Sequence, residues 1–453
     1  MMYRGDRAAG TSNAVRNLSA IMAFSLAFAL LAGPRLQVFD VHAASVLMVS
    51  AGYLVFGLAS GKIDKPLVSI SAFLFPSLLY AISLALLLPL GTMEFSYVLA
   101  KAYVYAFAAA GLVKVYIHAY GSDWAVRLLR HVVFLWAILA LSGISFVLIP
   151  WYRGWVGENF FMDGNYHWVE SGYRAYDLVS GGAFNGAFGY VVVVFIIALL
   201  WRRLRFSGLG AILLGLFVGF GGVLMARSFL VLFLVGLFTL LALMFIRAAL
   251  KRELVVRKAW LTMPLVVLVS FLIAYASFSV LPDHVRSWAF EFVDGDGRGL
   301  VMPGSLETIV GRMYFLPEGF VETLFGGGYL GRWESGPYVR SDVGYVRVLF
   351  NSGVLGLLLI IVPLGLLWGA AVYRYLRDGD GVALLLACLI VLIAVGNAKE
   401  LFVLPRNTGV LVLLVLFLYM KDRYRRVAWG WPHRETRVRG FARSFGAKVR
   451  VSA

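Results

Sequence analysis

Long apolar stretches recur along almost the whole chain, and short polar segments separate them. A helix needs roughly 17–25 mostly apolar residues to cross a bilayer. The pattern therefore predicts twelve transmembrane helices, with a tight turn near Gly221 and Gly222 between the seventh and the eighth. They lie at residues 18–33, 36–59, 66–90, 94–119, 124–149, 179–200, 206–223, 227–248, 260–281, 343–369, 382–399 and 405–420.

Composition agrees with this pattern. The chain is 61% hydrophobic and 14% charged, whereas soluble domains are about 45–50% apolar and roughly 25% charged. This excludes an ordinary soluble enzyme and predicts an all-α polytopic membrane protein. Arg4, Arg7 and Arg16 precede the first stretch, as in a secretory signal peptide, but the later spans favour an uncleaved first helix. A single cysteine, Cys388, excludes an intrachain disulfide and a cysteine metal cluster.

The distribution of lysine and arginine predicts the orientation of the helices. With the N-terminus in the cytoplasm, the inner segments hold 27 of the 41 basic and 8 of the 24 acidic residues. The inner face then carries +19 and the outer face −4. Because basic loops stay on the cytoplasmic side, both termini are expected there.

We expect residues 1–420 to form one transmembrane domain and residues 421–453 a basic cytoplasmic tail. The tail interleaves arginines with Trp429, Trp431 and Phe441. It is either an interfacial segment held on anionic lipid or a disordered topology anchor. Nothing else in the chain favours a nucleic-acid partner.

Two predicted outer loops, residues 150–178 and 282–342, are too long to be simple connections. In the second, residues 305–316 have the apolar spacing of an amphipathic helix that Pro317 ends. A short helix can resume at Glu318–Phe325 and end at the glycines 326–328. This glycine turn either exposes N–H groups to a phosphate or is a flexible turn.

Arginines are conspicuous in the outer segments, where a guanidinium can bind phosphate oxygens with two donors. They are Arg153, Arg174, Arg227, Arg286, Arg312, Arg332, Arg340 and Arg347. Arg227 lies between apolar residues, so it either contacts an anion in a polar cavity or snorkels to the interface. The other charges at membrane depth, Asp40, Lys101 and Lys114, are explained by buried ion pairs or helix ends.

No metal or cofactor motif is present. The segment 294–299 begins like a calcium loop, but Arg298 stands at position five, which needs an oxygen ligand, and Ser305 at position twelve, which needs a bidentate glutamate. His167 and His284 lack the spacing of zinc ligands. We therefore expect chemistry that is independent of metals and cofactors.

The stretch 311–357 reads GRMYFLPEGFVETLFGGGYLGRWESGPYVRSDVGYVRVLFNSGVLGL. An arginine, an amphipathic segment, a Gly-rich turn and a helix ending in GVLGL follow one another in this order. The stretch resembles the outer loop of the O-antigen ligase and Wzy-type polysaccharide polymerase superfamily, and Ala226–Ser228 resembles its Ser-Arg-Gly signature. Ligases of this group carry a histidine where this chain has Asp342, which favours the polymerase branch. Polymerases of this group also have Arg-x10-Gly spacings, which residues 153–164 and 286–297 match.

The resemblance implies a GT-C-like glycosyltransferase in the bacterial inner membrane, with its active site facing the periplasm. It would transfer a growing glycan from undecaprenyl pyrophosphate to the non-reducing end of a lipid-linked repeat unit. A chain-length regulator and a flippase are the partners that the resemblance implies.

This chemistry needs cations for the pyrophosphate, an acceptor for the proton of the attacking hydroxyl, and aromatic walls for the sugar. The pyrophosphate candidates are Arg227, Arg312 and Arg340, with Arg153 and Arg286 as secondary candidates. The candidate bases are Asp342, which is also placed to be a helix N-cap, and Glu334. Tyr314, Trp333 and Tyr338 are candidates for the walls.

Two other functions compete with this interpretation. An O-antigen ligase would transfer the finished polymer to the lipid A core. A twelve-span secondary transporter or flippase has the same layout, but its large central inner loop is missing here, where the sixth and seventh spans are joined by residues 201–205.

Overall fold

The computed structural model describes most of the chain. The described residues are 13–60, 64–89, 91–160, 172, 175, 183–226, 228–251, 283, 304–330, 339, 341–399 and 406–428. Within them the protein is helical, and the extended backbone contacts are isolated bridges between Arg35 and Asp40 and between Leu36 and Phe160.

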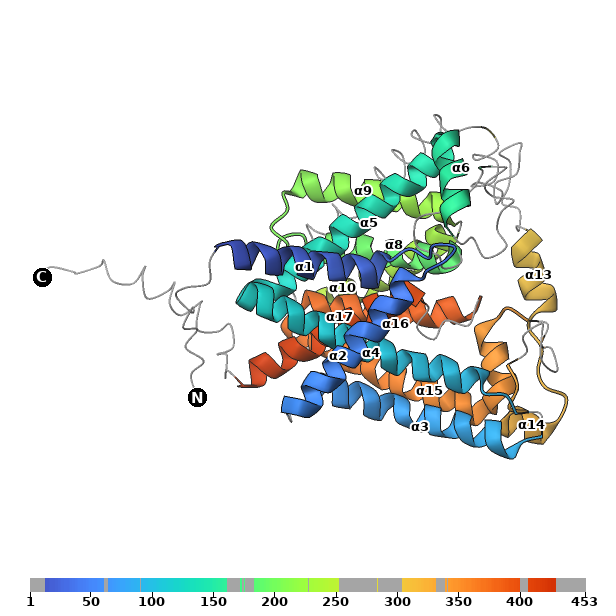
Figure 1. The fold of residues 1–453 in the computed structure, drawn as a ribbon. Coiled ribbons are helices and arrows are strands. Elements are labelled where there is room, and N and C mark those ends of the chain that lie inside the picture. The colour runs from blue at the N-terminus through green and yellow to red at the C-terminus, as the bar shows by residue number, and fades with distance from the viewer. Residues whose placement is uncertain are drawn as a thin grey trace, which may run out of the picture.

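The first part of the chain forms helices that run back and forth (Figure 1). They are α1 (Asn13–Ala32), α2 (Val41–Ser60), α3 (Lys65–Leu87), α4 (Glu94–Tyr120), the 3₁₀ turn η1 (Gly121–Asp123), α5 (Trp124–Leu148) and α6 (Pro150–Asn159). The later helices are α8 (Ala183–Leu200), α9 (Gly208–Met225), α10 (Ser228–Lys251), α13 (Gly304–Arg312), α14 (Phe320–Phe325), α15 (Gly344–Asp378), α16 (Gly381–Asn397) and α17 (Arg406–Ala428).

Helices occupy eleven of the twelve predicted spans, and the span at 260–281 lies outside the described residues. In the described part, five helical segments are long and apolar enough to cross a membrane. They are Lys65–Leu87, Glu94–Leu148, Gly208–Met225, Ser228–Leu250 and Gly344–Asp378. The prediction of a helical membrane protein is therefore confirmed, whereas the total of twelve spans and the orientation remain predictions.

The lipid-facing surface is apolar, as expected for membrane helices. On α3, Phe75 and Leu79 are more than half exposed, and on α15 Leu366 is 72% exposed. Such side chains would be costly in water but match the hydrocarbon of a bilayer.

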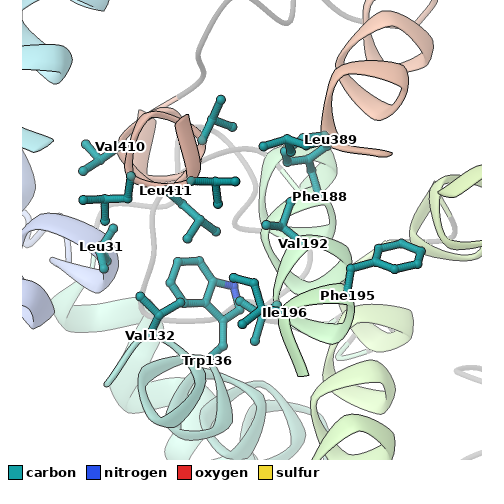
Figure 2. Close-up of a cluster of buried hydrophobic side chains, with 14 of the residues drawn as sticks. Leu31, Val132, Trp136, Phe188, Val192, Phe195, Ile196, Leu389, Val410 and Leu411 are labelled. Atoms are coloured by element: carbon teal, nitrogen blue, oxygen red, sulfur yellow. The ribbon is translucent and has the colours of Figure 1, made fainter. Parts of the chain in front are cut away.

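The core lies where α5, α8, α16 and α17 meet (Figure 2). Trp136 of α5 faces Ile196 of α8 and Leu411 of α17 in this view. Gly189 permits the contact of α8 with α5, because a Cβ there would lie 2.9 Å from Trp136 Nε1. Close contact between helices through small residues is typical of membrane proteins, in which no hydrophobic force drives helices together.

The tight turn predicted near Gly221 and Gly222 is not there. Both glycines lie within α9, which continues to Met225, and α10 begins at Ser228. A Cβ on Gly221 would lie 2.6 Å from the Cβ of Ala140 in α5. The glycines are therefore sites of close helix contact, a role that the hydropathy pattern does not separate from a turn.

Of the charges at membrane depth, Asp40 lies at a helix end as expected, whereas Lys114 forms a half-exposed ion pair and Lys101 lies within α4 over an aromatic ring. Asp40 Oδ1 accepts a hydrogen bond of 2.8 Å from the N–H of Ala43 in the first turn of α2. Lys114 Nζ lies 3.4 Å from Asp64 Oδ1. The Tyr53 hydroxyl donates a hydrogen bond to Oδ2 of the same carboxylate. Lys101 lies over the ring of Tyr105.

The short helices α6, α13 and α14 lie at one end of the bundle, on the right of Figure 1. Since α6 belongs to the first long loop and α13 and α14 to the second, the described parts of the two loops share one end of the protein. The connection between α8 and α9 lies at the opposite end.

Candidate functional site

The second long loop folds onto the beginning of α15. The amphipathic helix predicted at 305–316 is confirmed as α13, although it ends at Arg312, and the short helix before the glycines is α14. Ile309 and Met313 of this loop pack against Val343 and Val346. Ile309 therefore connects α13 to the beginning of α15.

Ser341 holds the loop and the beginning of α15 together. Its hydroxyl donates a hydrogen bond of 2.7 Å to the carbonyl of Met313 and accepts one from the N–H of Val343. Its own carbonyl accepts a hydrogen bond of 2.7 Å from Arg347 Nε. Because Met313 follows Arg312 and Ser341 precedes Asp342, these bonds bring the backbones of two predicted site residues together.

Asp342 and Arg347 form an ion pair at this end of the protein, with 3.6 Å between Oδ1 and Nη2. The Asp342 side chain is 64% exposed, whereas that of Arg347 is 20% exposed. The prediction that Asp342 caps α15 is wrong, since the N-cap residue is Val343 and no side chain caps the helix. The carboxylate faces solvent instead, where it can meet a substrate.

Two tyrosines attach this region to the end of α16. The Tyr314 hydroxyl donates a hydrogen bond of 2.6 Å to the carbonyl of Ala398, and the Tyr345 hydroxyl donates one of the same length to Ala394. The last carbonyls of a helix lack partners within the helix, so these hydroxyls satisfy them. Tyr314 thus has an anchoring role, and its ring remains 49% exposed.

The glycine turn is neither a phosphate cradle nor a loose connection. The N–H groups of Gly326, Gly327 and Gly328 donate to the carbonyls of Glu322, Phe350 and Asn351. These N–H groups are therefore occupied, and the expectation that they are free for a phosphate is wrong. Gly326 and Gly328 have φ of 89° and 78°, which explains the need for glycine.

The partner of this turn is a break in α15. Gly353 has φ 62° and ψ −169°, so α15 consists of a short outer segment, Gly344–Ser352, and a longer membrane segment. Phe350 and Asn351 lie at the end of the outer segment, where helix carbonyls lack intrahelical partners. The N–H groups of Gly327 and Gly328 supply those partners. These hydrogen bonds hold the glycine turn against the break at Gly353.

Tyr329, directly after the glycine turn, closes the contact. Its hydroxyl donates a hydrogen bond of 2.6 Å to Glu322 Oε1 in α14. Burial and this bond to the carboxylate raise the pKa of Tyr329 to about 12. The neutral phenol is therefore the form that the fold binds.

An apolar crevice of about 140 Å³ lies between α3, α4, α15, α16 and α17. Its polar lining residues are Ser69, Ser77 and Asn397. Two of its lining residues, Ile393 and Asn397, belong to the last turns of α16. They are the sequence neighbours of Ala394 and Ala398, whose carbonyls the two tyrosines bind. The crevice can take an apolar chain.

The predicted residues are only partly brought together. Arg312 is exposed at the end of α13, beside the Ser341 contact. Arg153 is on α6, where it lies against Gly172 and donates to the Val147 carbonyl, and no described contact joins it to Asp342. Several candidates lie outside the described residues: Arg227, Arg286, Arg340, Glu334, Trp333, Tyr338, His167, His284 and residues 294–299.

Two residues of the cluster were not singled out by the sequence. Arg347 is one of several outer arginines, and nothing in the local pattern places its guanidinium beside Asp342. Ser341 has no distinctive sequence signal. In the structure it is 2% exposed and forms hydrogen bonds with Met313, Val343 and Arg347. Among the described residues, no group of three or more His, Cys, Asp and Glu side chains could hold a metal ion.

No protein-family model, curated protein or solved structure matches this chain.

Proposed function

We propose that this membrane protein is a glycosyltransferase of the polysaccharide polymerase type. It transfers a growing glycan from undecaprenyl pyrophosphate to the non-reducing end of a lipid-linked repeat unit. The reaction takes place at the periplasmic face of the bacterial inner membrane. The observation that supports the proposal is the exposed Asp342 carboxylate, paired with Arg347 at the beginning of α15. Tyr345 of the same segment bonds to the end of α16, a helix that also lines the apolar crevice.

The crevice suits the lipid part of the substrate. Its walls are mostly leucine and isoleucine side chains from five helices. Burial of a prenyl chain there is favourable by about 25 cal/mol per Å² of apolar surface. A lipid-linked donor held in this way would place its pyrophosphate beside the polar cluster at the helix ends.

The arginines suit the leaving group. Arg347 is held by the Ser341 carbonyl through Nε, which leaves its terminal nitrogens for Asp342 and for an anion. Arg312 is exposed beside the same serine contact. Fixed guanidinium groups stabilise the negative charge that develops on a departing pyrophosphate.

Asp342 suits the attacking group. The acceptor hydroxyl oxygen forms the new bond to the anomeric carbon while the bond from that carbon to the pyrophosphate oxygen breaks. The lipid pyrophosphate leaves with the bonding electrons, and Asp342 accepts the hydroxyl proton. The chemistry needs no redox step.

The test is the Asp342→Asn variant, with Glu318→Gln as a matched control, since Glu318 is an exposed carboxylate of the same loop. Loss of a general base typically lowers the rate by about 10²–10⁴-fold. We expect Asp342→Asn to abolish polymer formation by purified protein with lipid-linked oligosaccharide, and the control to retain it. Wild-type turnover by Asp342→Asn would refute the proton-accepting role.

Surface polysaccharide from a deletion strain separates the competing functions. A polymerase deletion leaves single repeat units on the lipid A core, whereas a ligase deletion leaves none. A transporter or flippase would move the glycan lipid into sealed vesicles while the purified protein forms no glycosidic bond.

A further inference from the structure

A second cavity lies at the other end of the bundle, where α5 begins and the connection from α8 reaches α9. It has a volume of about 340 Å³. Its lining residues are Arg127, Arg130, His131, Val133, Phe134, Phe206 and Leu214. Two arginines and a set of apolar side chains therefore share one small space.

Arg130 is fixed in place by the turn that precedes α9. Its Nε donates a hydrogen bond of 2.7 Å to the carbonyl of Leu204, and its guanidinium lies 6.0 Å from the centre of the Phe206 ring. Arg205, between these two residues, has φ 57°, a left-handed conformation that costs a non-glycine residue about 1–3 kcal/mol. In this conformation the turn brings both the Leu204 carbonyl and the Phe206 ring into contact with the Arg130 guanidinium.

In the part of the chain that the structure describes, no ion pair neutralises the positive charge of this cavity. Neither Arg127 nor Arg130 forms an ion pair with any residue that the structure describes. Four other basic residues at this end do have acidic partners. The pairs are Arg374 with Asp380, Arg377 with Asp378, and Lys114 and Lys421 with Asp64.

The apolar side of the cavity continues onto the surface of the bundle that faces lipid. Phe134, one turn after Arg130 on α5, is 56% exposed, and Leu213 beside Leu214 on α9 is 58% exposed. Three further arginines, Arg202, Arg203 and Arg205, are exposed in the adjoining turn. The arginines match the anionic head group of a phospholipid, and the exposed apolar side chains next to them match its acyl chains.

We propose that this cavity binds the phosphate of an anionic phospholipid. Arg127 and Arg130 contact the phosphate oxygens, and the acyl chains lie along Phe134 and Leu213. Basic pockets between membrane helices on the cytoplasmic side bind anionic head groups. The assignment is independent of the transferase proposed above.

The experiment measures lipid binding to the purified, delipidated full chain by native mass spectrometry. Phosphatidylglycerol is the anionic probe, phosphatidylcholine is the zwitterionic probe, and inorganic phosphate tests whether the anion alone suffices. We expect the wild type to bind phosphatidylglycerol at least about tenfold more tightly than phosphatidylcholine. Inorganic phosphate should not displace it at millimolar concentration.

The variants are Arg127→Gln alone and together with Arg130→Gln, because Arg127 is exposed and its replacement leaves the Leu204 bond intact. The single variant should lower the preference for phosphatidylglycerol about fivefold, and the double variant should remove it. The control is Arg377→Gln, an exposed arginine at the same end that already has Asp378 as its partner. An unchanged preference in the single variant, or equal loss in the control, overturns the proposal. Displacement by inorganic phosphate overturns the assignment to a lipid.

Discussion

Replacing Gly353 by alanine tests the contact between the outer loop and the break in α15. The backbone of Gly353 has φ 62° and ψ −169°, a conformation that is essentially limited to glycine. An added Cβ would overlap the carbonyl of Leu324 and lie 2.6 Å from the amide nitrogen of Gly326. Both of these are backbone atoms and cannot rotate away, so α14 and the glycine turn must shift.

The magnitude follows from what the shift breaks. The backbone strain costs about 1–3 kcal/mol. The hydrogen bonds from Gly327 to Phe350, 2.7 Å, and from Gly328 to Asn351, 2.9 Å, are at risk, and each contributes about 0.5–1.5 kcal/mol net. Gly353→Ala should therefore lower the free energy of unfolding by about 2–6 kcal/mol.

The measurement is the midpoint of thermal unfolding of purified protein in a single detergent. The matched control is Gly365→Ala in the same helix, where an added Cβ meets nothing within 4 Å. Alanine is favoured over glycine inside a helix by about 0.5–1 kcal/mol, so this control should leave the midpoint unchanged or raise it. If the two variants have equal midpoints, the outer loop does not depend on the break in α15 and the reasoning fails.

Two further predictions concern charge. Arg374→Ala should destabilise the protein by about 3–5 kcal/mol, because it leaves the buried Asp380 without its ion-pair partner. The control Arg377→Ala, at an exposed ion pair, should cost about 0–1 kcal/mol. Equal midpoints of thermal unfolding for the two variants would contradict this prediction. The pKa of Tyr329 is raised to about 12, so its bond to Glu322 stabilises the fold fully below about pH 10 and is lost as the pH rises through 12. A Tyr329→Phe variant should accordingly differ from the wild type in stability at pH 8 but not above pH 12, and its phenolate absorbance should lack one late-titrating group.

The positions of the helices could be predicted because the bilayer imposes a simple rule. Every crossing segment must be apolar and must satisfy its own backbone hydrogen bonds, so length and hydropathy identify it. The same rule explains the error at Gly221 and Gly222. Glycine in an apolar stretch indicates either a turn or a close helix contact, and only the neighbouring side chains of Ala140 and Phe229 decide between the two.

The candidate site was harder to predict, since its geometry depends on contacts between distant segments. The sequence indicated Asp342 and Arg312, and the structure brings their backbones together through Ser341. It did not indicate Arg347, because one arginine among many in the outer segments has no local feature that predicts its partner. For the glycine turn the sequence left phosphate binding and a flexible turn as alternatives, because the pattern does not show which carbonyls the glycine N–H groups meet.

The break in α15 links the fold to the proposed chemistry. A broken helix in a membrane protein is tolerated only where other protein groups satisfy the freed backbone, and here Gly327 and Gly328 do so. Asp342 and Arg347 belong to the outer side of that break, whereas the crevice is lined by Leu359, Ile360 and other residues of the membrane segment beyond it. The glycine turn therefore holds the outer segment, which begins just after Asp342, against the break from which the membrane segment starts. Substitutions in this turn should therefore impair the reaction even though they touch neither Asp342 nor the apolar walls.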